Sequence, residues 1–159
     1  RSFVNFIQNH DQIANSAAGR RLHELTGAAE LRAMTALLLL MPGTAMLFQG
    51  QEFAATARFL FFADHKPDVA KMVHAGRREF LQQFPSTALP SVQRRIDDPA
   101  APATFEMSCL DHGERVVNAH VLRLHRDLIA LSRSDTVFAS QDGMHVDGAV
   151  LGAECFVLR

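Results

Sequence analysis

A strand, a long helix and a second strand follow one another in the first 50 residues, and this order constrains the fold more than any other feature. Ser2 to Gln8 are rich in β-prone apolar residues and precede a polar cluster, which predicts a short, largely buried strand. Apolar residues recur with helical spacing from Ala29 to Leu40, and Ala45 to Gln49 form a second apolar strand. Strands joined through a helix pair in parallel by a right-handed crossover, so the sequence predicts an α/β fold.

Two more helices are predicted downstream. Pro67 to Phe84 begin with a proline suited to a first helical turn and carry an apolar stripe. Glu114 to Ser132 have the clearest periodicity, with apolar residues spaced by four and three that form a seam. The proline-containing stretch between them, Thr87 to Asp111, shows no clear period and is predicted to be an irregular surface excursion.

The last part of the chain changes to a β pattern. From Met144 onward short strands are predicted, joined by Asp147 and Gly148 as a type I′ hairpin turn. The chain opens inside one apolar strand and closes inside another, at Cys155 to Leu158. We therefore expect a piece of a longer protein.

Charge, length and cysteine content exclude several functional classes. The 16 basic and 17 acidic residues are mixed along the chain, so no basic field exists for a nucleic acid or an anionic membrane. The longest apolar run, Ala36 to Met41, falls far short of the roughly 20 residues of a membrane span, and no leader segment is recognised. Cys109 and Cys155 match neither a disulfide framework nor a zinc site, which favours the cytoplasm. A neutral substrate fits this composition, and no metal or cofactor is expected.

Four segments resemble one enzyme family. Phe3 to Gln12 resemble the seventh-strand motif of the α-amylase superfamily, glycoside hydrolase family 13. Pro42 to Phe53 resemble the eighth strand and its loop, and Phe59 to His65 resemble a substrate loop of the malto-oligosyltrehalose trehalohydrolase branch. Thr104 to Asp111 contain short matches to the same branch. The ordered series is more specific than the Asn-His-Asp triplet alone, which recurs across many amylase-like enzymes.

The resemblance implies a division of the chain. Residues 1–133 are expected to be the C-terminal portion of a catalytic (β/α)8 TIM barrel, comprising strands seven and eight with their helices. Residues 134–159 are expected to begin a C-terminal β-sandwich domain that is truncated. Retaining glycosidases need a nucleophile and a general acid, and the resemblance places both upstream of Arg1. Arg95 to Asp97 match the Arg-x-Asp spacing of the nucleophile only by chance, because no strand leads into them. This chain alone is therefore expected to be inactive.

The resemblance also assigns roles to individual residues. Asp11 resembles the third family carboxylate, which stabilises the oxocarbenium-like transition state by accepting hydrogen bonds from the sugar. His10 is expected to donate a ring N–H to the same sugar. The other expected substrate-binding residues are Asn9, Gln12, Gln51, Glu52, Phe62, Asp64 and His65.

Local structural roles compete with these assignments. Asn9 to Asp11 are also typical of residues that cap a loop and the following turn. Glu52 can satisfy loop amides instead of a sugar, and an aromatic stripe such as Phe59 to Phe62 is more often core. Arg20 and Arg21 are expected to be solvated or paired with acids such as Glu24, which disfavours a phosphate site.

The resemblance implies that the parent protein hydrolyses the α-1,4-glucosidic bond adjacent to the terminal trehalose of maltooligosyltrehalose. One rival is an α-glucan branching enzyme or another amylase-type enzyme, which transfers the glycosyl group to a sugar. A second rival is a non-catalytic carbohydrate-binding or interaction module. The expected partner is an oligosaccharide, with no nucleic acid and no membrane. Self-association is also expected, because half a barrel exposes strand edges and a helix seam.

Overall fold

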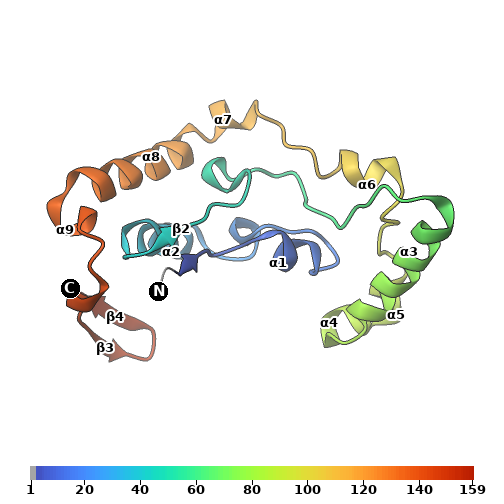
Figure 1. The fold of residues 1–159 in the computed structure, drawn as a ribbon, viewed down its shortest axis with the longest axis horizontal. Helices are drawn as coiled ribbons and strands as arrows, with labels where there is room; N and C mark the ends of the chain where they lie inside the picture. Colours follow the sequence, from blue (N-terminus) through green and yellow to red (C-terminus); the bar gives the residue numbers. More distant parts are fainter. Residues whose placement is uncertain (1–2) are drawn as a thin grey trace.

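The two strands predicted in the first 50 residues pair in parallel. The computed structural model describes residues 3–159. Strand β1 (Val4–Asn5) lies beside β2 (Thr44–Ala45), with Val4 opposite Thr44, and the amide of Thr44 donates to the carbonyl of Phe3 (3.1 Å). Helix α1 (His10–Ala14), the 3-10 helix η1 (Leu22–Glu24) and helix α2 (Ala28–Leu40) connect them (Figure 1). The predicted strand-helix-strand order and its parallel pairing are confirmed.

The strands are shorter and more exposed than the sequence predicts. Each has two residues, and the part of the first predicted strand at Ser2 lies outside the described residues. Val4 is 55% exposed and Phe3 68%, so the expected burial is wrong for this chain. Within residues 3–159, β1 has a hydrogen-bonded neighbour on one side only, and no second layer covers the side chains of Phe3 and Val4. The prediction of exposed strand edges is confirmed.

Helix α2 matches its predicted bounds to within one residue. Its buried face consists of Thr35, Leu38 and Leu39, and the hydroxyl of Thr35 donates to the carbonyl of Leu31 (2.8 Å). The helix ends at Leu40 because Pro42 and Gly43 follow. No helix within residues 3–159 is long and apolar enough to cross a membrane.

The chain after β2 turns sharply instead of continuing as a strand. The 3-10 helix η2 (Gln51–Phe53) lies between Gly50 and Ala54, which both have left-handed backbone angles (φ 80° and 49°). The carboxylate of Glu114 accepts a hydrogen bond from the amide of Thr56 (3.0 Å) and another from its hydroxyl. A residue 58 positions away thus holds this turn.

Gly50→Ala is expected to lower the free energy of unfolding by about 2–4 kcal/mol. A Cβ at this position would lie 2.7 Å from the Cβ of Ala55 and 2.8 Å from the Cδ2 of Leu110, and the backbone angle disfavours any side chain. Urea unfolding of the purified protein measures the change. The matched control is Gly152→Ala, whose added Cβ meets no atom within 4 Å. Equal stability of the two variants would contradict the prediction.

The predicted helix Glu114 to Ser132 is present but interrupted. Helix α7 (Glu114–Val117) and helix α8 (Ala119–Ser134) are separated at Asn118, whose side-chain amide donates to the carbonyl of Phe53 (3.0 Å). This hydrogen bond connects the interruption between α7 and α8 to η2. Helix α8 packs along α2 as expected of a helix seam, whereas Val117 at the start of that seam is exposed (Figure 1).

The segment between the long helices contains more structure than predicted. Helix α3 (Pro67–Leu81) ends three residues before the predicted Phe84. The expected irregular excursion, Thr87 to Asp111, contains the end of one short helix and two further short helices. Each of the three begins with a proline in its first turn, where the missing N–H has no helical partner. These helices are α4 (Pro85–Ala88), α5 (Pro90–Gln93) and α6 (Pro102–Glu106).

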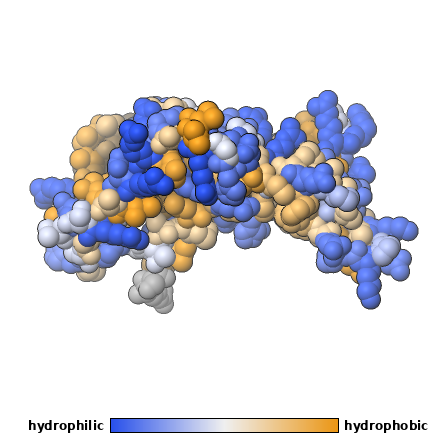
Figure 2. All heavy atoms as spheres, turned by 90° about the horizontal axis from the view of Figure 1, so that it is seen from above, coloured by the Kyte–Doolittle hydropathy of each residue, from blue (hydrophilic) through white to orange (hydrophobic). Residues whose placement is uncertain are grey.

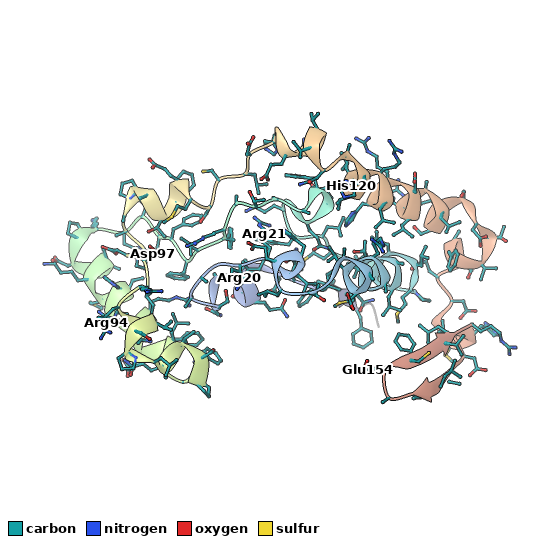
Figure 3. All side chains as sticks on the ribbon, turned by 180° about the vertical axis from the view of Figure 1, so that it is seen from behind. Arg20, Arg21, Arg94, Asp97, His120 and Glu154 are labelled. Carbon is teal, nitrogen blue, oxygen red and sulfur yellow. The ribbon has the colours of Figure 1, made fainter. Side chains whose placement is uncertain are left out.

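The C-terminal hairpin forms with a different turn from the one predicted. Helix α9 (Thr136–Ala139) and the 3-10 helix η3 (Gly143–His145) precede the antiparallel strands β3 (Gly148–Gly152) and β4 (Cys155–Leu158). The strands are joined at Ala153 and Glu154, and Figure 3 shows Glu154 at this turn.

Asp147 and Gly148 lie at the open end of this hairpin, so their prediction as the turn is wrong. The backbone amide and carbonyl of Asp147 each bond to Arg159, at 2.9 and 2.8 Å. Gly148 is needed there for close strand approach, since a Cβ would lie 2.9 Å from the carbonyl oxygen of Val157. The expected boundary of a β domain at residue 134 stays a prediction.

Hydrophobic side chains remain at the surface in several places. Figure 2 shows them as separate orange patches between hydrophilic residues. Large exposed apolar residues include Phe3, Val4, Met34, Val116, Val117, Val150, Leu151 and Phe156. They lie in or next to both strand pairs, in α2 and in α7, so the fold leaves apolar faces of several elements without a covering layer.

Candidate functional site

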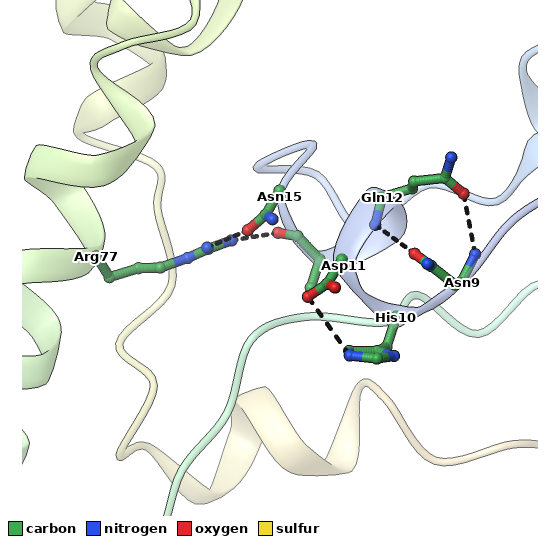
Figure 4. Close-up of polar contacts among 7 residues, drawn as sticks. Asn9, His10, Asp11, Gln12, Asn15 and Arg77 are labelled. Carbon is green, nitrogen blue, oxygen red and sulfur yellow. Dashed lines mark hydrogen bonds and ion pairs between the residues drawn. The ribbon is translucent and has the colours of Figure 1, made fainter.

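Helix α1, which carries the Asn-His-Asp triplet, begins with a capping box. The side-chain oxygen of Asn9 accepts a hydrogen bond from the amide of Gln12 (2.9 Å), and the side-chain oxygen of Gln12 accepts one from the amide of Asn9 (3.1 Å) (Figure 4). These two bonds satisfy amides that a helix start otherwise leaves unpaired. The capping interpretation therefore holds for Asn9, and Gln12, for which no capping role was predicted, completes the box. The expected contacts of both residues with substrate stay predictions.

The capping box does not use the side chains of His10 and Asp11. The side chain of Asp11 is 71% exposed, and Nε2 of His10 lies 3.4 Å from its Oδ1 (Figure 4). Both residues line a groove of about 600 Å³. The other lining residues are Ala14, Asn15, Phe59, Leu60, Phe61, Phe62, Val73, Gly76, Arg77 and Phe80. A concave surface of aromatic residues with a few converging polar groups is the usual form of a ligand site.

The groove brings together residues that are distant in sequence. Helix α1 forms one side, the extended segment 59–62 another, and helix α3 a third. Of the predicted site residues, His10, Asp11 and Phe62 line it, and their contact with a substrate stays a prediction. Asp64 and His65 are exposed and lie outside the lining residues, so their predicted contacts have no support from this groove.

The aromatic segment 59–62 is partly core and partly groove. Phe59 packs edge-on against Phe48 (ring centroids 4.9 Å apart), and Phe62 packs edge-on against Phe105 (5.2 Å). The amide of Leu60 donates to the hydroxyl of Ser108 (3.1 Å), which fixes the backbone of the segment. Phe61 and Phe62 nevertheless remain 40% and 36% exposed, so both rings keep surface available to a ligand.

Arg77 on helix α3 is a site residue that the sequence analysis missed. Its guanidinium donates hydrogen bonds to the side-chain oxygen of Asn15 and to the carbonyl of Ala14 (Figure 4). It also lies over the ring of Phe61, 4.8 Å from the centroid. A signal was present in the sequence, because Arg77 follows Val73 by four residues and so shares its helical face.

Both buried arginines have a lowered pKa. Burial lowers the pKa of Arg77, and no opposing charge offsets this effect. Burial also lowers the pKa of Arg21, whereas the nearby carboxylates of Glu24, Glu114 and Glu52 raise it. Since an arginine starts from a very high pKa, both guanidinium groups remain charged. The groove therefore holds one fixed cation, Arg77, and the carboxylate of Asp11.

Arg21 is a structural residue and not the start of an anion site. It is fully buried, donates to the carbonyls of Ala57 (2.5 Å) and Gln49 (2.6 Å), and lies over the ring of Phe48. The expectation of a solvated or acid-paired side chain is wrong, because the guanidinium satisfies carbonyls of the turn around η2. Only its backbone amide bonds to the carboxylate of Glu24 (2.8 Å).

Gln51 and Glu52 lie away from the groove. Gln51 is buried, and its side-chain oxygen accepts hydrogen bonds from Nε2 of Gln8 (3.3 Å) and from the amide of Phe48 (3.3 Å). The contact with Gln8 links the segments that follow β1 and β2. The carboxylate of Glu52 lies 3.8 Å from the guanidinium of Arg115. Contact of either residue with a substrate stays a prediction.

Other arrangements considered from the sequence give no second site. Asp97 lies in the coil after α5, with no strand leading into it (Figure 3). Within residues 3–159, no group of three or more histidine, cysteine or acidic side chains is placed to hold a metal ion. The groove at Asp11 is thus the place where the predicted residues His10 and Asp11 meet Arg77, which the sequence did not predict.

Sequence comparison finds relatives that all carry one name. The malto-oligosyltrehalose trehalohydrolase of Deinococcus radiodurans is 40% identical over 156 residues, covering 94% of this chain and 25% of that protein. That of Arthrobacter ramosus is 38% identical, covering 94% and 26%. That of Saccharolobus solfataricus is 30% identical, covering 82% and 21%. The chain thus spans about a quarter of the length of these curated relatives. No protein-family model matches it.

One solved structure supports the same relationship. A crystal structure of a candidate α-amylase from Salmonella typhimurium superposes with a TM-score of 0.76 at 33% sequence identity. The match covers 94% of this chain and 25% of that one. The α/β arrangement of β1, α2 and β2 is therefore that of a region within an α-amylase-type protein.

Proposed function

Because this chain belongs to the malto-oligosyltrehalose trehalohydrolases as a segment of about a quarter of their length, we propose that it is part of a longer glycoside hydrolase. That enzyme cleaves the α-1,4-glucosidic bond next to the terminal trehalose of maltooligosyltrehalose and releases trehalose. The observation that carries the proposal is the exposed carboxylate of Asp11, at the rim of a groove lined by aromatic rings.

The proposal places β1 and β2 as strands seven and eight of a (β/α)8 barrel. Their parallel pairing through α2 supports this placement, since neighbouring barrel strands are joined in that way. The groove residues of α1 follow β1, on the side where barrel enzymes carry their active sites. The other strands belong to the rest of the protein and would cover the exposed edge of β1. Residues 1–133 then complete the barrel, and residues 134–159 begin a C-terminal β domain.

In this enzyme Asp11 stabilises the transition state. As the glycosidic bond breaks, positive charge develops on the sugar ring, and hydrogen bonds from its hydroxyls to a fixed carboxylate strengthen. His10 lies beside Asp11 and donates a ring N–H to the same sugar. Phe61 and Phe62 offer partly exposed rings to the apolar faces of the oligosaccharide. The nucleophile and the general acid come from the part of the enzyme outside this chain.

Product analysis tests this function. The full-length protein incubated with maltooligosyltrehalose is expected to release free trehalose together with a shortened malto-oligosaccharide. The purified 159-residue chain is expected to release none, because hydrolysis needs the two carboxylates it lacks. Longer or branched products in place of trehalose would instead identify a transferase of the amylase type. Trehalose release by the 159 residues alone would contradict the proposed division of catalytic groups.

A further inference from the structure

We propose that Arg77 is a positioning residue that holds the turn bearing Asp11 and the ring of Phe61 in one fixed arrangement. This inference rests on the proposed function of Asp11 as the carboxylate that faces the sugar. It assigns a role in the reaction to helix α3, which enters the groove from a separate part of the sequence. Arg77 itself touches no reacting atom and acts through the two groups that it holds.

Arg77 anchors the C-terminal end of helix α1 to helix α3. The helix has five residues, and a helix of that length is not stable by itself. The capping box fixes its start, and near its end the carbonyls of Asp11 and Ile13 accept hydrogen bonds from the amides of Asn15 and Ser16. The last carbonyl of the helix, that of Ala14, is held from outside this segment. Arg77, 63 residues away, donates to the carbonyl of Ala14 and also to the side chain of Asn15. The amide of Asn15 bonds to the carbonyl of Asp11 (3.0 Å), so the anchored residue and the carboxylate share one helical turn.

The planar guanidinium of Arg77 is better suited to holding the end of α1 than a point charge such as an ammonium group. Arg77 is 9% exposed, and no ion pair with a carboxylate involves it within the described part of the chain. Buried cations are normally paired with an acid. Here two neutral oxygens accept from separate nitrogens of its planar fork, which fixes direction as well as distance.

The same side chain also positions the aromatic wall of the groove. Its guanidinium carbon lies 4.8 Å from the ring centroid of Phe61 and 5.9 Å from that of Phe80. Phe61 and Asp11 both line the groove, on different segments. Arg77 thus connects the polar and the apolar sides of the site. Misplacement of catalytic groups by about 1 Å can lower a rate on the order of 100-fold, so this connection matters for turnover.

The decisive experiment compares variants of the full-length enzyme. Arg77→Met keeps an unbranched apolar stem and removes the donors and the charge of the guanidinium, and we expect kcat to fall about 10- to 100-fold. Arg77→Lys is expected to remain impaired, because an ammonium lacks the planar fork. The matched control is Arg78→Met, since Arg78 is exposed on the same helix and lines no part of the groove. It should keep the wild-type kcat.

A double-mutant cycle separates positioning from stabilisation of the fold. If Arg77 acts through Asp11, then Arg77→Met added to Asp11→Asn lowers kcat little further than Asp11→Asn alone. Two outcomes overturn the proposal: wild-type kcat for Arg77→Met with only a lower melting temperature, or losses that multiply fully in the double variant. Should Arg77→Met not fold, Asn15→Ala removes one acceptor and should lower kcat roughly 2- to 10-fold, the scale of one hydrogen bond. An unchanged kcat there overturns the proposal as well.

Failure of the proposed function gives a different result. If Asp11→Asn keeps the wild-type kcat, the proposed transition-state role of the Asp11 carboxylate is wrong, independently of the results for the Arg77 variants. If Asp11→Asn is inactive and Arg77→Met is fully active, the proposed function stands and the positioning role falls.

Discussion

Asp11→Asn in the full-length enzyme is expected to lower kcat by at least about 10²- to 10³-fold, with little change in the melting temperature. Asparagine has nearly the same shape but carries no charge, so it cannot strengthen its hydrogen bonds as positive charge develops on the sugar. The side chain of Asp11 is 71% exposed in this chain, and asparagine has almost the same volume, so the replacement removes little packing. Its ion-pair contact with His10 is also solvated, so its loss costs little stability. Steady-state kinetics of trehalose release measures the effect.

The control for this experiment is Asp127→Asn. Asp127 is an exposed carboxylate on α8 that lines no part of the groove at Asp11. Its replacement removes the same charge from the protein and should leave kcat unchanged. A wild-type kcat for Asp11→Asn would contradict the assignment of Asp11, and an equal loss in both variants would show a general effect of charge.

Gly76→Trp is expected to raise KM for the oligosaccharide about tenfold or more, equivalent to about 1.4 kcal/mol of binding free energy. Gly76 lies on α3 and lines the groove, and a Cβ added there meets no atom within 4 Å. An indole therefore has room to enter the groove without displacing the helix. It would occupy space that the substrate needs. Initial rates over a range of substrate concentrations give KM and kcat separately.

Gly76→Ala is the matched control for the blocked groove. The methyl group fills little space, and alanine is favoured over glycine inside a helix by about 1 kcal/mol. This variant should keep the wild-type KM and have a slightly higher melting temperature. If Gly76→Trp also keeps the wild-type KM while folding normally, the substrate does not pass along α3.

The elements with long periodic patterns were predictable from the sequence. The bounds of α2 and the start of α3 agree with the apolar spacing and with the prolines that begin or end each helix. The parallel pairing of β1 and β2 also followed from their connection through a helix. These features depend on residues that are close together in the chain, which is why local pattern predicts them.

Errors arose where distant residues decide a local structure. The predicted helix from Glu114 is broken at Asn118, because its side chain bonds to the loop after β2. The hairpin turn was predicted at Asp147 and Gly148 but lies at Ala153 and Glu154, because the backbone of Asp147 pairs with Arg159. At the helix break and at the hairpin turn, the local sequence allows two conformations. A contact with a residue distant in the sequence stabilises one of them.

The candidate site divides in the same way. The sequence by itself determined the α/β order and the position of Asp11 in the polar cluster that follows the first strand, because both depend on neighbouring residues. The short helix α1 and its capping box of Asn9 and Gln12 were not predicted and came from the structure. Only the tertiary structure decided that α3 forms a wall of the groove and that Arg77 and Arg21 are buried. The physical reason is that burial of a guanidinium depends on carbonyls and rings supplied from dozens of residues away, and no short stretch of sequence contains both the donor and its acceptors.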